Sequence, residues 1–428
     1  MGSGPLTRRR AYPFLMASIG LCLFLQGHLS TPAVAVFIKN EMDTVDPERL
    51  FDSRYFLDLF SFSFPLQWRW EDLVSPQIYR INAASLDRSD LLILQEVRIA
   101  RPLAKRPDGD GAPPWLNFRY DLRQNEDKDL QEFHQWISLE VGPWRGFSLG
   151  VFGEPTFSKE NADIGFLLRH APKPGLDLYA SVDFVDWNFN ERGKTVQRYE
   201  RLPVTYEGGV RYGSGSDIWK LSLEYDSPLV RTDTAQNLSY SYRKTTLAAR
   251  WDRIPGDRSS LGISAHYRYE FKREANHFNP DPSFLTSDFQ RNTHRLGLAT
   301  SVPLTPKDDL EIGSFYLLRQ ARADAPQDTT TVRYTRWELQ PYGRWRRALK
   351  SWMISEVALF SSGGENRQFY RSPALTRISQ SNLLAKLGLG IDFLTFSKGR
   401  IGVYGTFDLD RADRHLWGGG NIRAQWPF

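Results

Sequence analysis

GGGNIRAQWPF, residues 418–428, is the stretch that decides the fold. Every second residue in its last part is apolar: Ile422, Ala424, Trp426 and Phe428. Successive side chains of a β-strand point to opposite faces, so this period of two predicts a strand with one apolar face. Because this last strand is apolar and has two aromatic side chains, we expect its apolar face to meet lipid rather than water.

This ending resembles the last strand of the bacterial (Gram-negative) outer-membrane β-barrel superfamily, which typically ends in Phe and serves as the assembly signal. The resemblance is to a porin-like superfamily and indicates no particular family. It implies that the chain lies in the cell outer membrane, in contact with outer-membrane lipid and lipopolysaccharide. It also implies that the barrel-assembly machinery recognises the C-terminal signal, which comprises Ile422, Ala424, Trp426 and Phe428.

The first residues follow the order of a secretory signal peptide. Arginines at 8–10 precede an apolar run at 11–26, and Ala33-Val34-Ala35 has the small-x-small pattern of a cleavage site. An N-terminal anchor that stays attached is the alternative. We expect three parts: a signal peptide over 1–35, a periplasmic lead-in over 36–57 and a transmembrane barrel over 58–428.

Composition excludes several other classes of protein. The chain carries 55 Lys+Arg against 50 Asp+Glu, and three of the arginines lie in residues 1–35, which leaves 52 basic and 50 acidic residues. This near balance, without a basic recognition motif, argues against a nucleic acid partner. The mean hydropathy of −0.47 excludes a helical membrane protein. A barrel stays compatible with it, because only every second strand residue has to be apolar. The single cysteine, Cys22, lies in the signal peptide, so we expect no disulfide.

The rest of the chain alternates between dyad-patterned runs and turns. The period of two is clearest over 261–272 and 383–393. Short turns are expected at 142–146, 172–175, 213–216, 255–257, 303–307 and 397–399. Longer polar loops are expected at 188–202, 228–240, 274–289, 321–330 and 362–381. Short periplasmic turns opposite longer extracellular loops are the layout of an antiparallel transmembrane β-barrel, which is the fold class that the sequence predicts.

The number of strands depends on how the first part of the barrel is interpreted. Phe and Trp alternate with polar residues over 58–70, residues 71–90 have the character of a loop, and a further strand is expected at 91–100. If 58–70 is a strand, the total is about 18; if neither early stretch belongs to the wall, it is about 16. We favour about 18, since the aromatic alternation over 58–70 has no other explanation. A soluble β-sandwich or propeller is the alternative.

If the apolar face meets lipid, the other face lines a lumen, and its charges are the candidate functional residues. Both signs occur in nearly equal numbers, which predicts a mixed-charge lumen in which neighbouring charges compensate each other. The predicted lumen charges are Arg119, Glu140, Arg169, Asp183, Arg211, Lys220, Glu224, Arg250, Arg268, Glu270, Arg295, Glu311, Arg319, Lys386, Asp392 and Arg423.

Strong ion selectivity requires a constriction with charges of one sign. The best candidate for a loop that folds inward is 362–381, which has one acidic residue, Glu365. Its candidate constriction residues are Arg367, Tyr370, Arg371 and Arg377. An ordinary exposed loop is the alternative.

Signals for catalysis and for cofactors are weak. His134 shares a strand face with Ser138 and Glu140, and His266 shares one with Ser264, but neither group forms a triad. No cluster has the spacing of a zinc site, an EF-hand or a phosphate-binding loop. We therefore expect no enzyme activity, no metal and no cofactor.

The function that the sequence favours is an outer-membrane channel, porin-like, for small hydrophilic solutes. A first alternative is a barrel that encloses or docks another periplasmic or surface protein. The basic turn Arg344-Trp345-Arg346-Arg347 with Lys350 is a candidate docking site for a periplasmic partner. A second alternative is an outer-membrane hydrolase with a site at the rim or in the lumen. Substrate and oligomeric state are not encoded in any motif of the chain.

Overall fold

The computed structural model describes most of the chain beyond residue 77. The described residues are 78–87, 90–104, 115–126, 131–154, 162–187, 197–233, 238–253, 261–278, 285–325, 330–372, 374–394, 400–409 and 417–427. The predicted signal peptide at 1–35, the lead-in at 36–57, the strand at 58–70 and the terminal Phe428 lie outside these ranges. Among the described residues, none belongs to a helix long and apolar enough for a membrane span.

Nineteen strands make up almost all of the described chain, which confirms the all-β, antiparallel prediction. Their bounds are β1 Ile78–Asp87, β2 Asp90–Ala104, β3 Leu116–Glu126, β4 Gln131–Trp144, β5 Phe147–Gly153, β6 Ile164–Lys173, β7 Leu176–Phe184, β8 Gln197–Arg201, β9 Val204–Ser214, β10 Asp217–Asp233, β11 Leu238–Arg253, β12 Gly262–Phe278, β13 Leu285–Thr305, β14 Asp308–Ala325, β15 Thr330–Lys350, β16 Met353–Ser372, β17 Ala374–Leu394, β18 Arg400–Asp408 and β19 Trp417–Pro427.

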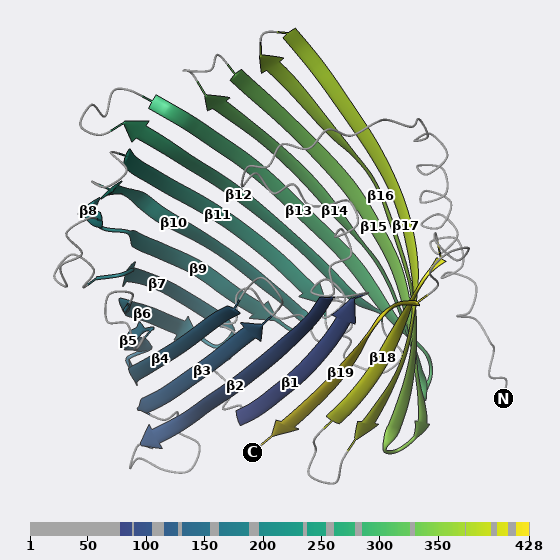
Figure 1. Ribbon diagram of the computed structural model, residues 1–428. Coiled ribbons are helices and arrows are strands. Elements are labelled where there is room, and N and C mark those ends of the chain that lie inside the picture. The colour runs from purple at the N-terminus through teal and green to yellow at the C-terminus, as the bar shows by residue number, and fades with distance from the viewer. Residues whose placement is uncertain are drawn as a thin grey trace, which may run out of the picture.

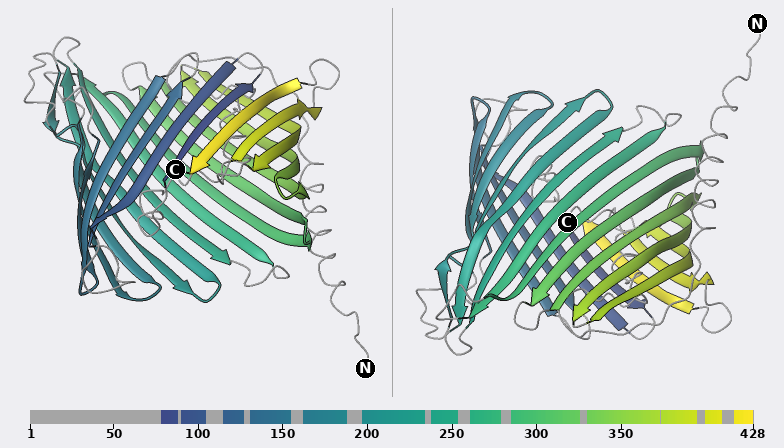
Figure 2. Two further views of the ribbon diagram at one scale, coloured as in Figure 1. Left: turned by 90° about the horizontal axis from the view of Figure 1, so that it is seen from below. Right: turned by 90° about the horizontal axis from the view of Figure 1, so that it is seen from above.

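Each strand pairs antiparallel with its neighbours in sequence, except around β8. That short strand pairs with the far end of β10, and β7 pairs directly with β9. The last strand, β19, pairs with β1 from Tyr79↔Pro427 to Leu86↔Gly420. The order of pairings therefore returns to its first strand. In Figure 1, β19 lies beside β1, and the left view of Figure 2 shows these strands crossing in front of the longer ones.

The connections at the two ends of the sheet differ. One end carries tight turns, such as those between β6 and β7, β9 and β10, and β15 and β16. At Gly175 the backbone has φ of +80°, a conformation that glycine adopts without strain. The end of β19 lies at this same edge, since Pro427 pairs with Tyr79 at the beginning of β1. We call this edge the tight-turn rim.

Several predicted loops are strands in the structure. The stretch 71–90 contains β1, and 188–202 contains β8. Residues 228–240 and 274–289 belong largely to the long strands β10–β13, and 362–381 forms the hairpin of β16 and β17. The prediction of a constriction loop at 362–381 is therefore wrong. The backbone ladder there continues from Gly363↔Leu383 to Ser372↔Ala374, which leaves a single residue to make the turn.

The two faces of the sheet differ sharply in chemistry. Apolar side chains exposed on one face alternate with buried polar side chains on the other. In β4, for example, Leu139 and Val141 are exposed and Glu140 is buried, and in β17 Leu389 and Ile391 are exposed and Asp392 is buried. We call the apolar side the outer face and the polar side the inner face.

Glycines on the inner face make room for aromatic side chains of neighbouring strands. Tyr404 of β18 lies against Gly390 and Gly402, where an added Cβ would come within 2.1 and 2.6 Å of its ring. Tyr404 belongs to a buried cluster with Tyr342, Ala358 and Phe360, which extends the core along the inner face from β15 to β18. Glycine is thus required at 390 and 402 by the close approach of the ring.

Candidate functional site: the charged inner face

The predicted lumen charges lie on the inner face wherever the structure describes their side chains. Arg119, Glu140, Asp183, Lys386 and Asp392 are buried. The half-buried members are Arg169, Arg211, Lys220, Glu224, Arg250, Arg268, Glu270, Arg295, Glu311 and Arg319. For Arg423 the structure describes only the backbone, which pairs with Ala83 and Gly402. Their role in a lumen remains a prediction.

The sector of the inner face from β15 to β18 is tightly packed. Glu338 is 2% exposed and accepts hydrogen bonds from Arg336 at 2.7 Å and from Ser362 at 2.7 Å. Lys386 lies 3.3 Å from Asp408, with both side chains at most 7% exposed. Charges buried this deeply are stable only when they are paired and hydrogen-bonded. The β15–β18 sector is therefore a polar core.

A similar group occupies β4, β6 and β7. The Arg169 guanidinium donates two hydrogen bonds to Asp177, at 2.7 and 2.5 Å, and one of its nitrogens lies 3.8 Å from Glu140. Glu140 is 4% exposed. This bidentate geometry fixes the guanidinium and leaves Asp177 engaged by a single cation.

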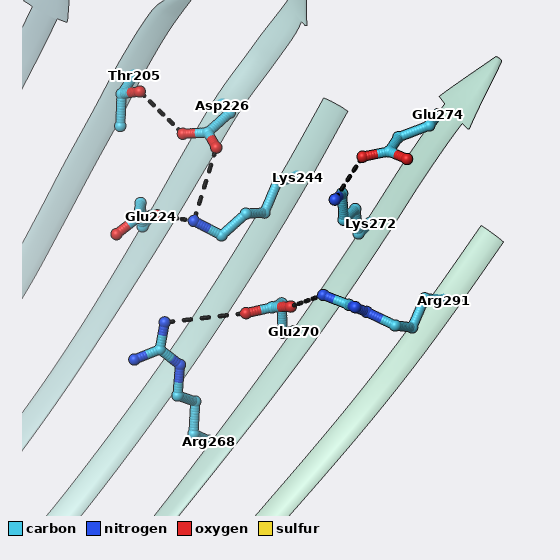
Figure 3. A network of polar contacts seen from close by, with 9 residues as sticks. All are labelled: Thr205, Glu224, Asp226, Lys244, Arg268, Glu270, Lys272, Glu274 and Arg291. Carbon is cyan, nitrogen blue, oxygen red and sulfur yellow. Dashed lines mark hydrogen bonds and ion pairs between the residues drawn. The ribbon is translucent and has the colours of Figure 1, made fainter. Parts of the chain in front are cut away.

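The sector from β9 to β13 is more open, and its upper part, away from the tight-turn rim, holds the network of Figure 3. Lys244 lies 2.7 Å from Glu224 and 3.7 Å from Asp226. Glu270 lies 2.9 Å from Arg291 and 3.9 Å from Arg268. Acids and bases alternate across the strands in this network, so their charges largely cancel.

Closer to the tight-turn rim, the same sector carries a row of cations. Arg211 of β9 is directly opposite Lys220 of β10, and Lys220 is directly opposite Arg250 of β11. Arg250 is opposite His266 of β12. Two residues further along β12, away from the tight-turn rim, Arg268 is opposite Arg295 of β13. We call Arg211, Lys220 and Arg250 the cation row. Directly opposed side chains have Cβ atoms about 4.5–5.5 Å apart.

Two members of the cation row have an acid beside them. Asp252 lies 2.7 Å from Arg250, and Asp177, which is opposite Arg211, is already held by Arg169. Like charges directly opposite each other destabilise a sheet. Their half-buried side chains keep contact with solvent. Such an arrangement attracts anions from solution and could hold a carboxylate or phosphate by several hydrogen bonds.

The other residues predicted from the sequence do not come together at one site. The backbone of Arg367, Tyr370 and Arg371 belongs to β16 and that of Arg377 to β17. Arg367 lies on the outer face, beside Glu365 at 2.6 Å. His266 packs against Phe315, with ring centroids 5.5 Å apart. The side chain of His134 lies outside the described residues, so the hydrolase alternative gains no support.

The C-terminal signal residues continue the wall. Ile422 is 57% exposed on the outer face, opposite Ala84 and Val403 in the neighbouring strands, and Ala424 is half-buried. The side chain of Trp426 lies outside the described part. Their role in assembly remains a prediction.

Sequence reasoning missed Lys244, Arg336 and Glu338, which make some of the closest polar contacts on the inner face. The alternation of Arg336, Glu338 and Gln340 with Trp337 and Leu339 was a signal that could have identified two of them. No group of His, Cys, Asp or Glu in the described residues has the geometry of a metal site.

An acidic group lies beyond the strands at the edge opposite the tight-turn rim. The backbone N–H of Asp186 donates to Asp163 at 2.9 Å, and the Tyr199 hydroxyl donates to Asp186 at 2.9 Å. Burial raises the pKa of Asp163 to about 7, and the neighbouring Asp183 and Asp186 carboxylates also raise it, against the Asp186 hydrogen bond, which lowers it. Asp163 therefore titrates near neutral pH.

These features define the class: an all-β protein whose antiparallel wall has an apolar outer and a charged inner face. No family model matches the chain, and no curated protein matches it. The solved structures that it resembles include outer-membrane β-barrel proteins. OmpT of Vibrio cholerae is 9% identical, with 82% of this chain and 97% of that chain covered and a TM-score of 0.36. OccK10 (OpdN) of Pseudomonas aeruginosa is 11% identical, with 83% and 98% covered and a TM-score of 0.38. OccK5 (OpdH) of the same organism is 9% identical, with 82% and 97% covered and a TM-score of 0.41. At these values the likenesses carry no argument about what this chain does.

Proposed function

We propose that the chain is an outer-membrane β-barrel of about 18 strands, the nineteen described strands without the short β8, that conducts small hydrophilic solutes and favours anions. The observation that carries the proposal is the separation of chemistry between the two faces. A wall that is apolar outside and charged inside suits a protein with lipid around it and water within it.

The outer face supports a position in a membrane. Leu221 and Leu223 of β10, Leu296 and Leu298 of β13, and Leu359 of β16 are each between 41% and 53% exposed. Soluble proteins rarely leave so many large apolar side chains on one continuous surface. Aromatic pairs at the tight-turn rim, such as Trp219 with Trp251 and Trp352 with Phe393, fit an interfacial girdle.

The inner face supports conduction of anions through one sector. The β15–β18 sector is packed and would not contribute an open path, whereas the charged inner-face side chains of the β9–β13 sector stay half-buried. The cation row lies in this open sector. Three cations that are directly opposite each other on neighbouring strands would concentrate anions there at low ionic strength.

The test is conductance of the refolded mature protein in a planar bilayer, with a salt gradient that reports anion over cation preference. The triple variant Arg211→Ser, Lys220→Ser, Arg250→Ser removes the cation row. The triple variant Arg145→Ser, Lys173→Ser, Arg253→Ser removes three exposed cations at the tight-turn rim and is the matched control.

We expect steady anion-preferring conductance in the wild type and the rim control, and a reversal potential shifted toward cation preference in the cation-row variant. Circular dichroism of each refolded variant checks that the β-sheet is intact. A wild type that inserts without conducting would overturn the channel. Conductance with the same selectivity in both variants would overturn the anion preference alone.

A further inference from the structure

Arginines also form a belt on the outer face, at the end away from the tight-turn rim. Arg243 of β11 is directly opposite Arg273 of β12, which is opposite Gln290 of β13. Gln290 is opposite Arg322 of β14, and Arg322 is directly opposite Arg333 of β15. One unbroken row of opposed residues across five neighbouring strands thus brings four arginines together, with Gln290 between them on β13.

The belt is accessible. Arg243 and Arg333 are exposed, and the side chains of Arg273 and Arg322 are 38% and 54% exposed. Arg367 of β16, with a side chain 46% exposed, lies next to the end of the row, because it pairs with Thr335, two residues from Arg333. We define the arginine belt as Arg243, Arg273, Arg322, Arg333 and Arg367.

The belt follows directly after the apolar part of the outer face. On β12 the outward residues Tyr267, Tyr269 and Phe271 lead to Arg273, and Arg243 lies over the Phe271 ring at 5.2 Å. The same order holds on β14, where Tyr316 and Leu318 precede Gln320 and Arg322, and on β15, where Leu339 and Trp337 precede Thr335 and Arg333. An aromatic girdle followed by cations is the profile expected at the level of lipid headgroups.

The distance across the wall fits that level. Trp345 and Arg333 are outward residues of β15 twelve positions apart. At about 3.4 Å per residue and a strand tilt of about 40°, they are separated by roughly 30 Å along the membrane normal, which is the thickness of a hydrocarbon core. If Trp345 lies at one interface, the belt lies at the other.

The chemistry of the belt favours phosphate. All five cations are arginines, whose planar fork binds phosphate oxygens in pairs. Asp288 lies 2.8 Å from Arg273, Asp324 lies 2.6 Å from Arg322 and Glu365 lies 2.6 Å from Arg367, so three of the arginines are held in place by an acid. Five cations against three acids leave the belt with a net positive charge.

We propose that the arginine belt binds the phosphate groups of the phosphorylated glycolipid of the outer leaflet, with its acyl chains against the apolar band below. The inference rests on the proposed outer-membrane function. The belt lies at the end opposite the tight turns and the end of β19, which is the extracellular end of a barrel in that membrane. A soluble anion would use the arginines but have no use for the aromatic band beside them.

The test uses the refolded mature protein in detergent and follows its thermal unfolding as lipid is added. The probes are purified lipopolysaccharide, the same lipid after removal of its phosphates, phosphatidylglycerol and inorganic phosphate. The belt variant is Arg243→Gln, Arg322→Gln, Arg333→Gln, and the matched control is the rim variant Arg145→Ser, Lys173→Ser, Arg253→Ser.

We expect lipopolysaccharide to raise the unfolding temperature of the wild type and the rim control. The belt variant, which lacks three cations, should need roughly a hundredfold more lipid for the same rise, since each cation near an anionic surface contributes about a factor of five. Arg243→Lys, Arg322→Lys, Arg333→Lys keeps the charge without the fork and should fall between the two. It also serves as the test if the glutamine variant fails to fold.

Equal lipid binding by wild type and belt variant would overturn the inference, as would equal binding of the dephosphorylated lipid. Phosphatidylglycerol bound as tightly as lipopolysaccharide would reassign the belt to phospholipid, and an effect of inorganic phosphate alone would reassign it to soluble anions. The bilayer conductance of the wild type distinguishes failure of the proposed channel function from failure of the proposed lipid binding by the belt. Loss of conductance refutes the channel, whereas a conducting protein without belt-dependent lipid binding refutes the belt alone.

Discussion

The inner face combines two sectors with the same residue types and opposite environments. From β15 to β18, Glu338, Lys386 and Asp408 are at most 6% exposed and each has a close polar partner. From β9 to β13, Lys244 and Glu224 also form an ion pair, but their side chains are 22% and 31% exposed. Charge alone therefore does not mark a functional surface, because the same residue types form a buried polar core in one sector and ion pairs in contact with solvent in the other.

The largest expected effect is the loss of a partner in the packed sector. Asp408→Ala leaves the Lys386 ammonium buried without the carboxylate that lies 3.3 Å away. Removal of one partner from a buried ion pair costs about 3–5 kcal/mol. We expect guanidinium unfolding to show a loss of free energy in that range, and the double variant Lys386→Met, Asp408→Leu to recover most of it. A loss below about 1 kcal/mol would show that water reaches this sector too.

A second effect in the packed sector comes from shape. Gly390→Ala places a methyl group 2.1 Å from the Tyr404 ring, so the ring has to move and its hydroxyl leaves Asp392, to which it donates at 2.7 Å. We expect a loss of about 1–3 kcal/mol in the free energy of unfolding. Gly343→Ala is the matched control, because an added Cβ meets nothing within 4 Å there. Equal losses in the two variants would mean that glycine is needed for the backbone and not for the ring.

Removal of a charged partner from the open sector should lower the free energy of unfolding less than in the packed sector. Lys244→Met removes the cation between Glu224 and Asp226 in the network of Figure 3. Because solvent screens the two carboxylates, we expect a loss of at most about 1 kcal/mol in the same guanidinium assay. A loss as large as that of Asp408→Ala would abolish the distinction between the two sectors.

The sequence predicted which residues lie on each face of the sheet better than it predicted the lengths of the strands. Where the outer face is apolar and the inner face polar, the period of two is strong, as over 383–393, and the assigned faces agree with the exposed and buried residues there. Beyond the apolar band both faces are polar, so the period disappears although the ladder continues. Residues 362–381 therefore had the composition of a loop, and β1, with its small residues Ala83 and Ala84, was missed for a similar reason.

The candidate site shows the same limit. Inward-facing charges could be selected from alternation along one strand, but the cation row depends on the register between strands. Arg211, Lys220 and Arg250 are separated by 9 and 30 residues in sequence and become neighbours only through the pairings of β9 with β10 and β10 with β11. The outer arginine belt was hidden in the same way, since nothing in a single strand shows that its arginine is opposite another.

The most local expected effect lies outside both sectors, at Asp163, and it extends the comparison to a carboxyl group beyond the wall. Burial raises the pKa of Asp163 from 3.8 to about 7 in the folded chain. The folded state therefore binds the proton more tightly than the unfolded state, so this group favours folding below about pH 4 and loses that contribution as the pH rises to about 7.

Asp163→Asn keeps an oxygen to accept from the Asp186 N–H and removes the titration. We expect hydrogen exchange in the β6–β7 hairpin to become faster between pH 5 and pH 8 in the wild type, after correction for the intrinsic exchange rate, and to change less in the variant. An identical pH dependence in the two proteins would mean that the Asp163 carboxyl is in full contact with water and that its pKa is not raised by burial.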